Sequence, residues 1–150
     1  MSNLYNTDFY QWTQQQAAAL AAGKAQELDW ANLAEEIESL GRSERKELRS
    51  YLEGLLLHLL KWAYQPDYRG RSWRDSIEEN RERVPECIAE SPSLRPLIPE
   101  LLLQAYRPAR RKAARQTRLN LQTFPETCPW TAEQVLDADF WPELSDASTG

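Results

Sequence analysis

The residues best suited to proton transfer lie in one apolar segment, where His58, the only histidine, is followed by Lys61 and Gln65. Helical spacing places these three side chains on one flank. Because a histidine titrates near neutral pH, His58 is a candidate general base or anion ligand, with Lys61 supplying positive charge. The alternative is a structural histidine, hydrogen-bonded to Asp29 or to the backbone of residues 66–72. A carboxylate partner would raise its pKa.

Other catalytic and metal-binding sets find little support. Cys128 and His58 are the minimum for a thiol nucleophile, but no pattern brings them together, and a small, easily buried side chain explains the cysteine. One histidine with two distant cysteines lacks the close ligand spacing of a zinc site. Glu53 precedes His58 by five residues, which is the wrong side of a helix for a di-metal carboxylate site. We therefore expect no metal and no cofactor.

A basic run is the feature most suggestive of binding. Its members are Arg107, Arg110, Arg111, Lys112, Arg115 and Arg118. Arg107, Arg111, Arg115 and Arg118 follow helical steps and form one stripe, and no acidic residue occurs between Leu101 and Pro125. Guanidinium groups in such a stripe suit phosphates or acidic partners. The alternative is docking of the acidic segment 126–146, or of the predicted helix 30–40, across the same helix.

Composition indicates an ordinary soluble protein. The 150 residues are 41% hydrophobic and 27% charged, with a net charge of −5. Two cysteines suit a reducing cytosol, and no secretory signal or run long enough to span a bilayer is expected. An acidic chain with a basic middle favours pairing between its own segments first and nucleic-acid binding second.

Helical periodicity extends through the chain, with no strand pattern. We predict helices at about 8–22, 30–40, 43–64, 73–90 and from Pro96 to Leu119, and a short one at 131–137. The expected caps are Asn6 or Thr7, Asp29, Ser72 with Asp75, and Thr131 with Gln134. This gives one all-α domain over residues 1–150, a bundle of five main helices and a short C-terminal helix, with residues 145–150 as a frayed tail.

Helix 43–64 is the expected centre, because Leu48, Leu52, Leu55, Leu59 and Trp62 follow its apolar stripe. Helix 30–40 is expected to bury Trp30, Leu33, Ala34, Ile37 and Leu40. A turn at Gly41-Arg42 would pack these two helices antiparallel. That pairing would place His58 near Asp29, and Glu35 within reach of Arg45 or Arg49. Pro85 and Pro108 are expected to bend their helices.

Several segments resemble the bacterial domain of unknown function 29 family, common in cyanobacteria. They include Asp8-Phe9-Tyr10-Gln11-Trp12, Leu33-Ala34-Glu35-Glu36-Ile37-Glu38-Ser39-Leu40-Gly41, His58-Leu59-Leu60-Lys61-Trp62, Phe124-Pro125 and Asp139-Phe140. The resemblance implies an all-α fold in the bacterial cytoplasm and carries over no activity, cofactor or catalytic residue. Pro85 and Pro108 stand where the family pattern is unbroken helix.

The favoured function is a non-catalytic binding or adaptor module that uses the arginine stripe against an acidic protein or nucleic acid. One alternative is an enzyme acting on a phosphorylated or nucleic-acid substrate with His58 and Lys61. Another is a small inhibitor or antitoxin-like protein. The sequence leaves substrate, partner and the choice between monomer and homodimer open, and it gives no indication of membrane binding.

Overall fold

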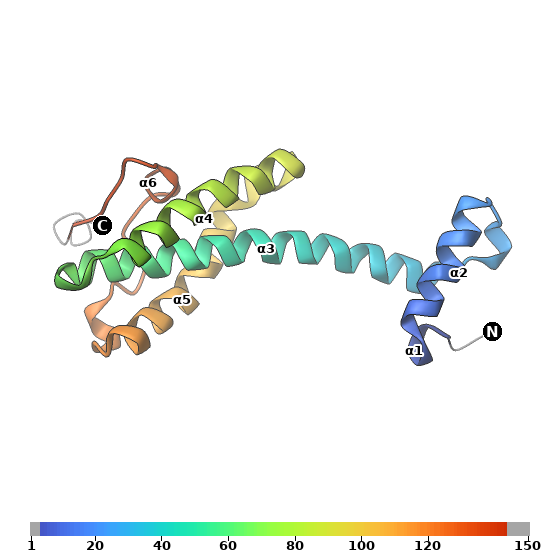
Figure 1. Ribbon diagram of the computed structural model, residues 1–150, viewed down its shortest axis with the longest axis horizontal. Helices are drawn as coiled ribbons and strands as arrows, with labels where there is room; N and C mark the ends of the chain where they lie inside the picture. Colours follow the sequence, from blue (N-terminus) through green and yellow to red (C-terminus); the bar gives the residue numbers. More distant parts are fainter. Residues whose placement is uncertain (1–3, 144–150) are drawn as a thin grey trace. The chain divides into compact units, whose positions relative to one another are not determined.

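The computed structural model describes residues 4–143, which form helices and no strand (Figure 1). The four long helices are α2 (Phe9–Ala21), α3 (Trp30–Tyr64), α4 (Arg71–Glu90) and α5 (Ile98–Thr117). Two short helices, α1 (Leu4–Thr7) and α6 (Ala132–Leu136), stand near the ends of the chain. The all-α class is therefore confirmed. The expected frayed tail, residues 145–150, lies outside the described residues.

The separate helices expected at 30–40 and 43–64 are one continuous helix, α3, so the prediction of a turn at Gly41 was wrong. Gly41 has an ordinary helical backbone, whereas Gly23 has φ +69°. A glycine inside a helix costs only about 1 kcal/mol relative to alanine. The ion pairs that Arg42 makes with Glu35 and Glu38, at 3.1 and 3.8 Å, add to the continuity across this glycine.

The chain divides into two compact units whose boundary falls between Ser43 and Glu44. We call them the N-terminal unit and the C-terminal unit and describe each by itself. The single domain expected from chain length stays a prediction.

In the N-terminal unit, the N-cap of α2 is Asp8, whose carboxylate accepts from the amide of Gln11 at 3.1 Å. The cap is thus one residue later than the expected Thr7. Gly23 ends the helix with its left-handed backbone, because the amides of Gly23 and Lys24 then reach the carbonyls of Leu20 and Ala19. Only Trp12, Gln16 and Ala19 of α2 are buried.

The burial expected for the start of α3 was also wrong. Trp30, Ile37 and Leu40 are 65%, 67% and 67% exposed. Ala34 is exposed too, and Leu33 is half-buried. Periodicity identified the apolar face of this segment, but no other part of the N-terminal unit within residues 4–43 covers that face.

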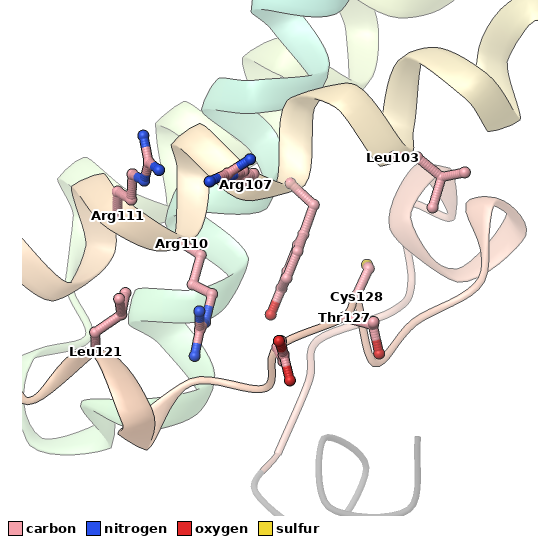
Figure 2. A pocket seen from close by; sticks show the side chains of 9 residues that line it. Leu103, Arg107, Arg110, Arg111, Leu121, Thr127 and Cys128 are labelled. Atoms are coloured by element: carbon pink, nitrogen blue, oxygen red, sulfur yellow. The ribbon is translucent and has the colours of Figure 1, made fainter.

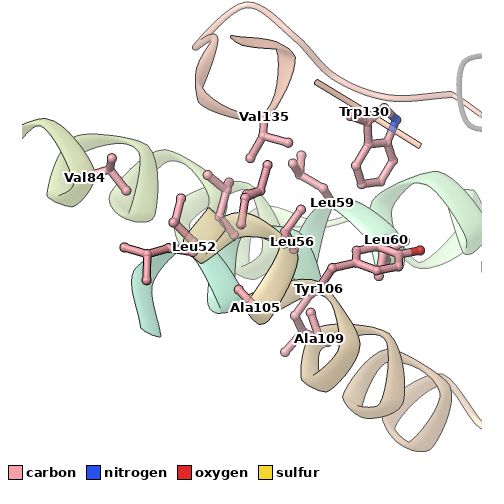
Figure 3. Close-up of a cluster of buried hydrophobic side chains, with 14 of the residues drawn as sticks. Leu52, Leu56, Leu59, Leu60, Val84, Ala105, Tyr106, Ala109, Trp130 and Val135 are labelled. Carbon is pink, nitrogen blue, oxygen red and sulfur yellow. The ribbon is translucent and has the colours of Figure 1, made fainter. Parts of the chain in front are cut away.

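The C-terminal unit is built around residues 48–63 of α3, as expected. Leu48, Leu52, Leu55 and Leu59 have no exposed surface. They join apolar side chains of α4 and α5 in one buried cluster, closed by Phe124, Trp130 and Val135 from the C-terminal segment (Figure 3). Alanines on α5, such as Ala105 and Ala109, are buried at this core and leave room for the leucines opposite.

The ends of α4 and α6 differ in how well they were predicted. The N-cap of α4 is Gly70, with no side-chain cap, so the predicted box of Ser72 and Asp75 does not form. The predicted box of Thr131 and Gln134 at the start of α6 is confirmed. Both α4 and α5 continue through their prolines, Pro85 and Pro108, and the expected bends stay predictions.

Candidate binding groove on α5

The six basic residues of the run on α5 divide into two groups. Arg110 donates from Nε and Nη2 to the carbonyl oxygen of Phe124, at 3.1 and 3.0 Å. Lys112 pairs with Glu53 of α3 at 3.0 Å. The other four members are exposed, and none makes an ion pair or side-chain hydrogen bond with any residue from 4 to 143. They are Arg107, Arg111, Arg115 and Arg118.

Three of these four arginines belong to the helix. Arg107, Arg111 and Arg115 follow steps of four residues along α5 and share one face. Arg118 lies just beyond the last helical residue, Thr117, and has a left-handed backbone with φ 62°. The stripe expected to continue to Arg118 therefore ends at Arg115. We call Arg107, Arg111 and Arg115 the arginine stripe.

Beside the stripe lies a groove of about 520 Å³ (Figure 2). Its lining consists of Leu103, Tyr106, Arg107, Arg110, Arg111, Leu121, Glu126, Thr127 and Cys128. Figure 2 shows Arg107, Arg110 and Arg111 on α5, with Thr127 and Cys128 on the segment across from them. Three guanidinium groups and one carboxylate therefore share the groove with apolar side chains.

Hydrogen bonds from α5 fix the opposite wall of the groove. The hydroxyl of Tyr106 donates to the carbonyl of Pro125 at 2.6 Å, and Arg110 holds the carbonyl of the preceding Phe124. Burial raises the pKa of Tyr106 far above its ordinary value, so this hydroxyl stays protonated and keeps donating. The groove is thus lined on one side by a helix and on the other by a segment bonded to that helix.

Cys128 is not arranged as a nucleophile. Burial raises the pKa of its thiol, and the sulfur donates to the carbonyl of Trp130 at 3.4 Å. A reactive cysteine needs a lowered pKa and a base beside it. The bonded partner here is a carbonyl rather than His58, so the geometry favours the structural explanation of this residue.

His58 does not meet Asp29, and that prediction was wrong. The half-buried imidazole donates from Nδ1 to the carbonyl of Gly54, one turn earlier in α3, at 2.8 Å. The expected bond to residues 66–72 does not form either. Burial lowers the pKa of His58, the bond to Gly54 opposes this shift, and the positive charge of Lys61 adds to it. A carboxylate partner would have had the opposite effect.

Lys61 and Gln65 do not line the groove, and Asp29 belongs to the other unit. Lys61 donates to Gln116 at 2.9 Å and lies 4.9 Å from the ring centre of Trp73. Asp29 accepts from Asn32 and Trp12, and these bonds lower its pKa. Gln65 is half-buried at the end of α3. The expected neighbourhood of His58 with Asp29 depended on the turn at Gly41, which does not exist.

The acidic residues of α3 also pair differently from the expectation. Glu35 pairs with Arg42 of its own helix and not with Arg45 or Arg49. In the part of the chain that the structure describes, no three His, Cys, Asp or Glu side chains are grouped so that they could hold a metal ion.

Sequence reasoning missed Arg81, which is only 6% exposed. It donates from Nε to the carbonyl of Val135 at 2.9 Å and from Nη2 to that of Phe140 at 2.8 Å. A signal was present, because Arg81 lies in phase with Ile77, Val84 and Ile88 on the buried face of α4. An arginine on an apolar stripe predicts a charge that is buried against carbonyl groups.

No helix within residues 4–143 is both long and apolar enough to cross a membrane. Comparison with curated proteins found no match, and comparison with solved structures found none either. The family model described as Domain of unknown function DUF29 matches residues 4–141, which is nearly the whole chain. The resemblance noted in the sequence is therefore confirmed, and the chain belongs to the DUF29 family.

Proposed function

We propose that this protein is a non-catalytic binding or adaptor module that takes an acidic segment of a partner protein in the groove on α5. The proposal rests on one observation about the arginine stripe. Its members Arg107, Arg111 and Arg115 are exposed and have no ion pair within residues 4–143. Five of the six acidic residues after Pro125 are described, and none of them neutralises the stripe. The alternative of an internally docked tail therefore lacks support.

The lining of the groove favours a protein segment over nucleic acid. Leu103, which is 73% exposed, and Leu121 offer apolar contacts next to the arginines. Glu126 adds a carboxylate that repels any nearby anion, so a ligand whose acidic groups are spaced apart suits the groove better than a continuous phosphate backbone. With a net charge of −5, the chain also lacks the broad positive field typical of nucleic-acid binding. An acidic peptide with an apolar side chain between its carboxylates fits both features.

The test uses a fluorescent peptide of aspartate and glutamate residues around one leucine, titrated with the full chain and followed by anisotropy. Replacing Arg107 and Arg111 together by alanine is expected to weaken binding by roughly tenfold or more, because each loses a charge-assisted contact. Arg95→Ala is the matched control, since this exposed arginine does not line the groove. Equal affinity of the double variant and the wild type would overturn the proposal.

A second arm of the test decides the partner class. A peptide with alanine in place of the leucine is expected to bind more weakly than the parent peptide. Single-stranded DNA of equal charge is expected to bind more weakly than either peptide. Tighter binding of the DNA would overturn the choice of a protein segment.

The setting of this function also belongs to the proposal. A bacterial cytoplasm, and the emphasis on cyanobacteria, follow from the resemblance and stay predictions. An inhibitor or antitoxin-like role would be one form of the same binding function. The enzyme alternative has less support, because the hydrogen bonds of His58 and Lys61 go to Gly54 and Gln116.

A further inference from the structure

Exposed apolar side chains are concentrated in the N-terminal unit. Within residues 4–143, six of the eight large hydrophobic side chains that are exposed precede Ser43, although this unit is less than a third of the chain. They are Phe9, Tyr10, Leu20, Trp30, Ile37 and Leu40. Exposed apolar groups gathered in this way mark interaction sites.

Three of these side chains, Trp30, Ile37 and Leu40, belong to one side of α3. Steps of four, three and four residues lead along this side from Trp30 through Ala34 and Ile37 to Gly41, and Leu40 flanks them. We call these five residues the Trp30 face. Leu48 follows Gly41 by seven residues and Leu55 follows Leu48 by seven, so both keep the helical phase of this face. Both leucines are fully buried. The Trp30 face therefore has the sequence pattern of a buried helix face, although its large side chains are exposed.

Within residues 4–43, the N-terminal unit does not cover the Trp30 face with its own side chains. Its buried side chains on α2 are Trp12, Gln16 and Ala19, of which only two are apolar. Polar bonds instead hold α2 to Asp29, the residue before α3. The indole nitrogen of Trp12 donates to the carboxylate of Asp29, and the backbone amide of Asp29 donates to the side-chain oxygen of Gln16. Units of about 40 residues usually need a metal, a disulfide or a partner chain to bury enough apolar surface.

We propose that a second copy of this chain covers the Trp30 face, with the two α3 segments packed antiparallel across a two-fold axis. A closed dimer of this kind is the commonest arrangement of soluble homo-oligomers. Ala34 and Gly41 are small, and the space where a side chain of Gly41 would stand is open, so two helices can approach closely there.

Charge determines the antiparallel direction. The flank beside the Trp30 face carries Glu35 and Glu38 toward the start of α3, and Arg42 after them. Arg42 pairs with both carboxylates in its own chain, but all three side chains are more than half exposed, so these charges can exchange partners with another chain. When the second copy runs antiparallel, Arg42 of each copy lies opposite Glu35 or Glu38 of the other. A parallel pair would lack this exchange of charges.

The first experiment measures the mass of the full chain by sedimentation equilibrium over a range of concentrations. We expect a monomer–dimer equilibrium. Ile37→Asp is expected to raise the dimer dissociation constant by roughly tenfold or more, because an unpaired carboxylate would enter the seam. Tyr68→Asp, at a similarly exposed large side chain outside both the Trp30 face and the groove, is the matched control and should leave the constant unchanged. A wild type that is monomeric at every concentration would overturn the proposal.

A charge exchange tests whether the charged flanks of the two copies face each other, without touching the apolar residues. Arg42→Glu makes the flank wholly acidic, and Glu35→Arg with Glu38→Arg makes it wholly basic, so each variant alone is expected to dimerise more weakly. Mixing the two should restore association as a heterodimer. Circular dichroism of each variant checks that its helices are retained. Failure of the folded mixture to associate more tightly than its components would exclude the proposed arrangement.

Discussion

The guanidinium of Arg110 donates from both Nε and Nη2 to the carbonyl oxygen of Phe124, fourteen residues later, at 3.1 and 3.0 Å. Phe124 is itself 1% exposed, so its carbonyl group has few alternative partners. One side chain from the basic run thereby fixes a buried residue of the C-terminal segment. The neighbouring Arg107 and Arg111 remain available to a ligand. Arg110 thus stabilises the fold, whereas Arg107 and Arg111 are the arginines proposed to bind a partner.

Arg110→Ala should destabilise the fold by about 1–3 kcal/mol, because the substitution leaves the carbonyl of Phe124 without its charged donor. Arg107→Ala is the comparison, and its effect should stay within about 0.5 kcal/mol, as at other exposed sites. Urea denaturation followed by circular dichroism measures both variants. Equal effects would show that the bond to Phe124 contributes no stability.

Arg81→Met should cost more, about 2–4 kcal/mol, because two carbonyls lose a charged donor while the apolar stem of the side chain is kept. Amide exchange should accelerate in residues 132–140, which include the accepting Val135 and Phe140. The control is Arg83→Met, where exposed pairs with Glu79 and Glu86 are worth little. A change in global stability without faster exchange in this segment would contradict the anchoring role.

The core of the C-terminal unit was predictable because a stripe of leucines specifies which face is buried. Leu48, Leu52, Leu55 and Leu59 are completely covered, as their spacing indicated. The same rule failed for Trp30 and Ile37. Periodicity defines a face but not what covers it, and a covering surface from another molecule leaves the same pattern in the sequence.

The arginine stripe shows a similar division. Helical spacing was enough to place Arg107, Arg111 and Arg115 on one face. Which basic residues are already bonded was not predictable, because the partners of Arg110 and Lys112 are Phe124 and Glu53, far away in sequence. The contacts predicted for His58 were wrong for a local reason. The predicted turn at Gly41 does not exist, so the contacts inferred from that turn do not exist either.

Two glycines of the N-terminal unit should respond oppositely to alanine. Gly41→Ala is expected to stabilise the protein by about 1 kcal/mol, because the residue is helical and its added methyl group meets no atom within 4 Å. Gly23→Ala should destabilise it by about 1 kcal/mol, since its φ of +69° disfavours any side chain. Thermal denaturation of dilute protein, where association is minimal, compares them. Destabilisation by Gly41→Ala would contradict the continuous helix.

His58 should give the protein a pH-dependent stability with a defined sign. Burial is the main cause that lowers its folded-state pKa below the ordinary 6.5. As the pH falls through about 6.5, the unfolded chain takes up a proton that the native state resists, so the free energy of unfolding decreases. This loss continues until the pH reaches the lowered pKa of the native state.

His58→Gln removes the titrating group, and His58 is the only histidine in the chain. The stability of the wild type minus that of the variant should therefore decrease between about pH 7.5 and pH 5, measured by urea denaturation at each pH. Taking the difference cancels the contribution of the carboxylates to the pH dependence, because they titrate in both proteins. If this stability difference increased toward low pH, His58 would take up a proton on folding. A carboxylate partner would cause such an uptake, whereas burial beside the carbonyl of Gly54 would not.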